Sequence, residues 1–153
     1  MKKIILLMSL LILGAANALA GGMHIYRGNS TYTSDILYTW DGKHLFRGNS
    51  TYTSDILYTW DGRYLYRGNS SYSSDILLTW DGRKVYQGCS TYTSDIIFTW
   101  DGTHILQGNS SYSSDILFTV SHGHIYRGRS AYTSDILYTY SGTIPIPVLL
   151  AVM

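Results

Sequence analysis

Apolar and polar residues alternate along a 20-residue unit, of which residues 43–62, KHLFRGNSTYTSDILYTWDG, are one copy. In its second half, every other residue from Tyr52 to Trp60 lies on one face of an extended strand, and the residues between them lie on the other. Period-two alternation with aromatic and β-branched residues predicts a strand, and no apolar stripe with a 3.6-residue period predicts a helix. The pattern therefore indicates an all-β protein.

The unit recurs without insertions, and a fixed period of this length defines a repeat architecture. The six copies span residues 23–42, 43–62, 63–82, 83–102, 103–122 and 123–142. Seven positions are identical in all six copies and are, in the second copy, Gly48, Ser50, Tyr52, Ser54, Asp55, Ile56 and Thr59. Identity within one chain reports either a shared structural demand or recent duplication. We assign residues 21–142 to a single repeat domain.

An Asp-Gly pair follows the predicted strand in four copies. These structural turn residues are Asp41, Gly42, Asp61, Gly62, Asp81, Gly82, Asp101 and Gly102. Asp-Gly between apolar runs predicts a tight hairpin in which both residues have positive φ. In the fifth copy Ser121-His122 replaces Asp-Gly, and we expect its turn to use Gly123.

The strand–turn–strand units are expected to stack as a β-hairpin stack or a β-solenoid. A hairpin stack repeats about every 9.6 Å, whereas a solenoid stacks identical side chains about every 4.8 Å. A solenoid would align the six repeated aspartates, which repel one another unless they are neutralised, so we favour hairpins. The alternative is a closed twelve-stranded antiparallel barrel.

The two ends of the chain differ from the repeats. Residues 1–20 have a basic start, an apolar run and the small-x-small motif Ala18-Leu19-Ala20, which is typical of a bacterial secretory signal peptide. Residues 143–153 are apolar and contain Pro145 and Pro147, and proline is confined to sheet edges. We predict export, no transmembrane segment after signal cleavage, and a C-terminal apolar capping strand over an open sheet end.

Charge and composition exclude several classes of function. Without Lys2 and Lys3, nine of the 11 Lys and Arg remain against ten acidic residues, all Asp, so the net charge is about −1. A chain without net positive charge is not expected to bind nucleic acid. The single Cys89 excludes a disulfide within the chain. No metal site is expected, because the neighbouring His122 and His124 have no acidic or Cys partner at ligand spacing. No cofactor is expected either.

Repeated aromatic residues are the strongest candidates for binding. They are Trp40, Trp60, Trp80, Trp100, Tyr52, Tyr72 and Tyr92. Their faces suit sugars or quaternary ammonium groups, and the plan of aromatic hairpin and polar loop is similar to that of choline-binding repeats. Packing of the same residues within the sheet is the alternative.

Near-identical units build a periodic surface, whereas catalysis needs one asymmetric pocket, so we expect no enzyme. The sequence predicts an exported structural or self-assembling surface or matrix component that is periplasmic, cell-surface or extracellular. In organisation it resembles curli-type amyloid subunits, which also repeat strand–turn–strand units behind a leader. The alternative is a multivalent binding module for a glycan, a choline-like ligand or a host-surface ligand. Its partners would be further copies of itself or an extracellular ligand.

Overall fold

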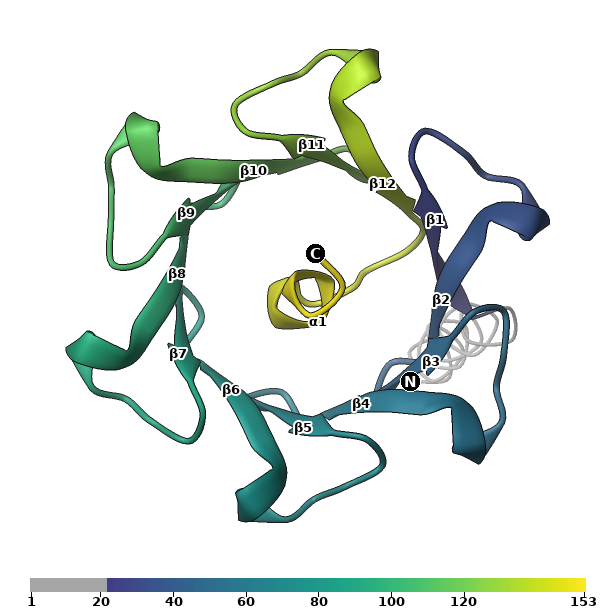
Figure 1. Ribbon diagram of the computed structural model, residues 1–153, viewed down its shortest axis with the longest axis horizontal. Coiled ribbons are helices and arrows are strands. Elements are labelled where there is room, and N and C mark those ends of the chain that lie inside the picture. Colours follow the sequence, from purple (N-terminus) through teal and green to yellow (C-terminus); the bar gives the residue numbers. More distant parts are fainter. Residues whose placement is uncertain (1–21) are drawn as a thin grey trace, which may run out of the picture.

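The computed structural model describes residues 22–153 and forms a closed barrel of twelve antiparallel strands (Figure 1). Each strand pairs with its neighbours in sequence, and β1 closes the ring by pairing with β12. The all-β repeat prediction is confirmed, but the favoured open stack gives way to the closed alternative. The predicted leader, residues 1–20, lies outside the described residues.

Every copy contributes two strands. One set begins at or near the start of each copy and comprises β1 (Met23–Arg27), β3 (His44–Arg47), β5 (Tyr64–Arg67), β7 (Lys84–Gln87), β9 (His104–Gln107) and β11 (His124–Arg127). The other set begins at the repeated isoleucine and comprises β2 (Ile36–Trp40), β4 (Ile56–Trp60), β6 (Ile76–Trp80), β8 (Ile96–Trp100), β10 (Ile116–Ser121) and β12 (Ile136–Tyr140). A register shift interrupts pairs such as β3–β4, and such bulges bend a sheet.

The tight turns differ from the prediction in one respect. In the pair Asp41-Gly42, the φ of Gly42 is positive, at 99°, but that of Asp41 is not. The Asp41 carboxylate instead accepts hydrogen bonds from the N–H groups of Lys43 and His44. The aspartate thus acts as a side-chain acceptor at the start of the turn. The fifth turn does use Gly123, and there His122 and Gly123 both have positive φ, of 51° and 78°.

Six longer loops join the opposite ends of the strands and project outward (Figure 1). We call these loops petals; they are residues 28–35, 48–55, 68–75, 88–95, 108–115 and 128–135. The predicted strand does not reach back to Tyr52, because Ser50 Oγ donates to Asp55 Oδ2 over 2.5 Å and bends the chain. A short 3-10 helix, Thr53–Asp55, then leads into β4.

Each petal is also anchored to the barrel wall. Thr59 is buried, and its Oγ1 donates to the carbonyl of Gly68 over 2.7 Å, at the point where the next petal begins. Gly68 has a φ of 62°, which favours glycine. Equivalent bonds are formed by Thr39, Thr79, Thr99, Thr119 and Thr139.

The interior of the barrel, which we call the lumen, is filled by the C-terminal segment (Figure 1). This segment forms a short helix, α1 (Ile146–Leu150), so the predicted capping strand is wrong. Pro145 and Pro147 lie at the start of the helix, where the lack of an N–H costs nothing. A closed barrel offers no edge to cap, and burial of Val148 and Leu149 removes their apolar surface from water.

Among the helices of residues 22–153, none combines the length and the apolar character that crossing a lipid bilayer would require.

Candidate functional site

Five of the seven identical positions have a role inside the repeat fold. Gly48 supplies a positive φ, Ser50 and Asp55 bend the petal, Ile56 starts a strand, and Thr59 anchors the next petal. The fold therefore accounts for their recurrence.

The other two identical positions, Tyr52 and Ser54, present exposed side chains. The main chain of Tyr52 is fixed, because its N–H donates to Ser50 Oγ and its carbonyl accepts from the N–H of Asp55. Its ring nevertheless projects into solvent. The equivalent tyrosines, between 73% and 76% exposed, are Tyr32, Tyr52, Tyr72, Tyr92, Tyr112 and Tyr132.

A half-buried position that faces the lumen varies more between copies than this exposed one does. Where the second copy has Tyr58 against the lumen, the other copies have Tyr38, Leu78, Phe98, Phe118 and Tyr138. Recent duplication alone would leave buried and exposed positions equally alike. Folding gains little from an aromatic ring left in water, so the constancy of the petal tyrosine points to a role on the surface.

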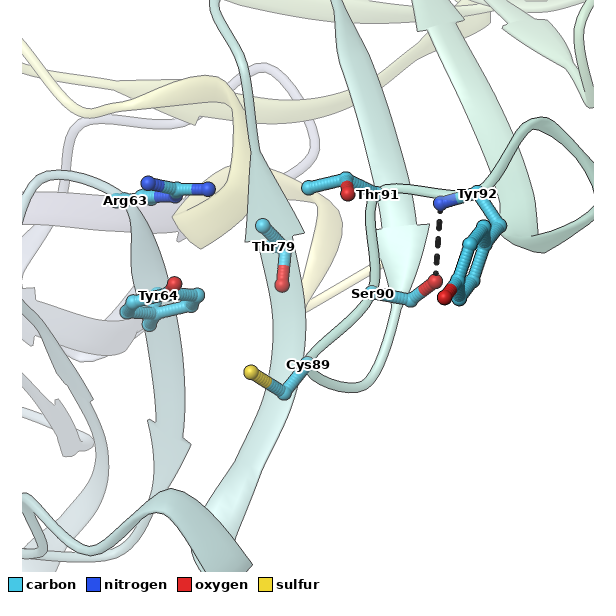
Figure 2. A pocket seen from close by; sticks show the side chains of 7 residues that line it. All are labelled: Arg63, Tyr64, Thr79, Cys89, Ser90, Thr91 and Tyr92. Carbon is cyan, nitrogen blue, oxygen red and sulfur yellow. Dashed lines mark hydrogen bonds between the residues drawn. The ribbon is translucent and has the colours of Figure 1, made fainter.

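Two grooves are lined in part by petal residues. One groove, of about 360 Å³, is lined by Arg63, Tyr64, Thr79, Cys89, Ser90, Thr91 and Tyr92 (Figure 2). A second, of about 250 Å³, is lined by Lys43, Thr59, Asp61, Tyr66, Asn69, Ser70 and Ser71. Five positions recur in both at a spacing of 20 residues. Each groove offers hydroxyl groups and one cation, and Tyr92 adds an exposed ring to the first.

The four predicted tryptophan sites fall into two pairs that differ in exposure. Trp40 and Trp60 are only 2% and 8% exposed, because the strand register turns them into the lumen. Trp80 and Trp100 are half-buried against the same interior cluster, and each lines a hollow beside a tight turn. The interpretation of the tryptophans as an exposed binding array is therefore wrong for Trp40 and Trp60.

Of the predicted tyrosines, Tyr52, Tyr72 and Tyr92 all lie exposed on petals. The prediction omitted Tyr32, Tyr112 and Tyr132, although their sixfold identity was the signal that could have identified them.

The turn carboxylates have structural partners that differ between copies. Tyr66 donates its phenolic proton to Asp61 Oδ2 over 2.9 Å. In the copy that has Phe46 at this position, His44 Nδ1 lies 3.1 Å from Asp41 Oδ2 instead. The first arrangement recurs at Asp81 with Tyr86, and the second at Asp101 with His104. Burial raises the pKa of all four carboxyls, but hydrogen bonds from backbone N–H groups and these partners outweigh it, so each pKa is lowered.

Within residues 22–153, no three His, Cys, Asp or Glu side chains gather closely enough to hold a metal ion. His122 belongs to the fifth turn, and His124 Nδ1 lies 3.1 Å from Thr139 Oγ1.

Comparison with known proteins gives one match. Residues 25–151 match the sequence model of a family described as "6-fold beta flower protein". No curated protein and no solved structure matches the chain. The description agrees with the six petals of the barrel.

Proposed function

The chain belongs to the 6-fold beta flower family, and from this premise we propose that it is an exported, non-enzymatic protein that binds a repetitive glycan through its petals. The observation that carries the proposal is the set of six equivalent tyrosines, each at least 73% exposed on a fixed main chain.

The chemistry of a petal favours sugars over charged ligands. Beside Tyr52 the exposed residues are Thr51, Thr53 and Ser54, which add hydroxyl donors and acceptors. The petal carboxylate, Asp55, is engaged by Ser50. An aromatic face with a polar tip and neighbouring hydroxyls suits a ligand that is apolar on one face and rich in hydroxyls at its edges.

The arrangement of six equal sites also favours a polymer. Each exposed tyrosine offers little binding energy by itself, but linked sites convert later contacts into intramolecular ones. A polysaccharide with a short repeat can occupy several petals together, so affinity would grow with chain length.

Structural self-assembly is the rival function. It ranks second because a closed barrel leaves no unpaired strand edge on which another chain could continue the sheet. Growth would therefore need contacts between outer faces.

The test is a polysaccharide-binding assay on the secreted protein, with size and light scattering recorded in parallel. We expect binding to rise with oligosaccharide length. Replacing three petal tyrosines by Ser should weaken binding at least about tenfold, and replacing all six should abolish it. Exposed Thr143→Ser, which lies outside the petals, is the control.

A monomer that enriches no glycan, or a six-tyrosine variant that binds as well as the wild type, would overturn the proposal. Growth of particles without glycan would favour the structural rival. Recovery of the chain only from the cytoplasm of the cells that produce it would remove the export part of the proposal.

A further inference from the structure

A second feature lies at one end of the lumen, where the strands that precede the petals end. The last residues of these strands are Arg27, Arg47, Arg67, Gln87, Gln107 and Arg127. Directly opposed residues in an antiparallel pair share a face. Trp40 opposes Leu45 and both pack in the lumen, so Tyr38 and its partner Arg47, two residues along, face the same side. All six polar side chains are exposed at this mouth.

The charges are not spread evenly around the mouth. In the order of the barrel, β11, β1, β3 and β5 contribute Arg127, Arg27, Arg47 and Arg67 in succession, and β7 and β9 complete the ring with the two glutamines. We call the four arginines the arginine arc. Alternate strands lie about 9.6 Å apart, twice the strand spacing, so neighbouring guanidinium groups can converge on one ligand.

Phenolic groups accompany the arc. Tyr138, Tyr38 and Tyr58 oppose three arginines of the arc, Arg27, Arg47 and Arg67. The fourth, Arg127, is opposed by Phe118, and the glutamines are opposed by Leu78 and Phe98. Burial raises the pKa of Tyr38, the neighbouring phenols Tyr138 and Tyr58 raise it further, and Arg47 opposes this rise. These groups are therefore close enough to interact. The O–H of Tyr138 donates to the carbonyl of Val152 over 3.2 Å, which leaves Tyr38 and Tyr58 as the phenolic groups beside the arc.

No arginine of the arc forms an ion pair within residues 22–153. The ion pairs there are His44–Asp41 and His104–Asp101, both beside tight turns at the other end of the strands. Petal aspartates such as Asp55 are held by serines. Four contiguous unpaired guanidinium groups on a chain of almost zero net charge form a local concentration of donors and positive charge.

We propose that the arginine arc, with Tyr38 and Tyr58, binds a ligand that carries several clustered phosphate groups. Guanidinium groups bind phosphate oxygens in pairs, and phenolic O–H groups add further donors. The neutral side of the mouth, with Gln87 and Gln107, places the ligand off the barrel axis, so each barrel takes one ligand. This site is distinct from the petal tyrosines and does not depend on the function proposed for them.

Calorimetric titration with inorganic tripolyphosphate tests the site. We expect one bound tripolyphosphate per barrel, with affinity that falls steeply as salt is raised. The triple variant Arg27→Gln, Arg47→Gln and Arg67→Gln should bind at least about 100-fold more weakly, because it removes three charge-assisted donors. Gln already occupies this position in two copies, so we expect the variant to fold, which circular dichroism checks.

The matched control makes the same change of charge at the tight-turn end of the barrel through Lys43→Gln, Arg63→Gln and Arg83→Gln. It should change affinity less than about threefold, because the changed charges lie away from the ligand. The gain variant Gln87→Arg with Gln107→Arg should bind more tightly than wild type. No binding at low salt, equal losses in the triple and control variants, or six ligands per barrel would each overturn the proposal.

Discussion

The petals and the lumen are built from the same six copies, but they treat the repeat differently. In every petal the serine hydroxyl donates to the aspartate over 2.5–2.6 Å. In the lumen, the position of Trp60 is Val120 in the fifth copy and Tyr140 in the sixth. The bend of the petals is therefore the same in all six copies, whereas the lining of the lumen is not.

The cause of the difference is the single helix in the centre. The bend of each petal is closed by a bond between a serine and an aspartate of the same copy, so these two residues recur wherever the petal stands in the ring. The lumen is filled by α1, and one helix cannot present the same surface to six strands. Close packing then favours different side chains at equivalent positions of some copies. The repeat keeps the same residues at the petal bend, and its residues differ where the strands pack against α1.

The largest loss of stability should come from a change in the central helix α1. Leu149 is 1% exposed within the lumen cluster. Leu149→Ala removes buried apolar surface and leaves a cavity, which should lower the free energy of unfolding by about 2–5 kcal/mol. Urea unfolding measures the loss, with exposed Thr143→Ala as the control. A loss below 1 kcal/mol would mean that the barrel does not depend on its central helix.

A periodic anchor should have a smaller effect. Thr79 is buried, and its Oγ1 donates to the carbonyl of Gly88 over 2.6 Å. Thr79→Val keeps the shape but leaves that carbonyl unpaired, which should cost about 1–2 kcal/mol in unfolding experiments. Thr91→Val, on an exposed petal, is the matched control and should change stability by less than about 0.5 kcal/mol. Equal losses for both variants would refute the anchoring role.

The turn carboxylates should give a still smaller effect that depends on pH. The pKa of Asp61 lies below its ordinary value of 3.8 in the folded protein, so folding favours the ionised form. This stabilisation is present above pH 3.8 and is lost as the pH falls through the lower, folded pKa. Asp61→Asn should therefore reduce the acid-induced loss of stability, measured by urea midpoints at pH 7 and pH 3. Ser121→Asn, at the turn without a carboxylate, should keep the wild-type pH dependence.

The smallest effect on stability is expected at the petal surface. Tyr52 is 75% exposed, so Tyr52→Ser should change the free energy of unfolding by no more than about 0.5 kcal/mol. Thermal and urea unfolding test this value. A loss above 1 kcal/mol would show that the ring supports the fold, and its recurrence would then need no role on the surface.

The local elements were predictable because their causes are local. The period, the strand pairs and the tight turns follow from alternation and from glycine at the positive φ of Gly42. Closure of the ring was not predictable, because it depends on curvature summed over all strands, including register shifts such as that between Leu45 and Phe46. The helical tail was misjudged because Pro145 and Pro147 suit both a sheet edge and the first turn of a helix.

The candidate site was predictable only in part. Alternation placed Tyr52 and Trp60 on one face of a single strand. In the structure the bond from Ser50 to Asp55 bends the chain, so β4 begins only at Ile56 and does not include Tyr52. The arginine arc was open to sequence reasoning, since Arg47 lies two residues from the buried Leu45. Its grouping on one side of the mouth required knowledge that β1 closes on β12.

That closing pair, in which Ile25 opposes Tyr140, also determines when folding can finish. During synthesis β1 emerges first, and its outer edge waits for a partner that emerges more than 100 residues later. Pairings so distant in sequence form slowly. A ribosome that stops before β12 would release a chain with two open edges and an empty interior, so only the finished product is protected from pairing with its neighbours.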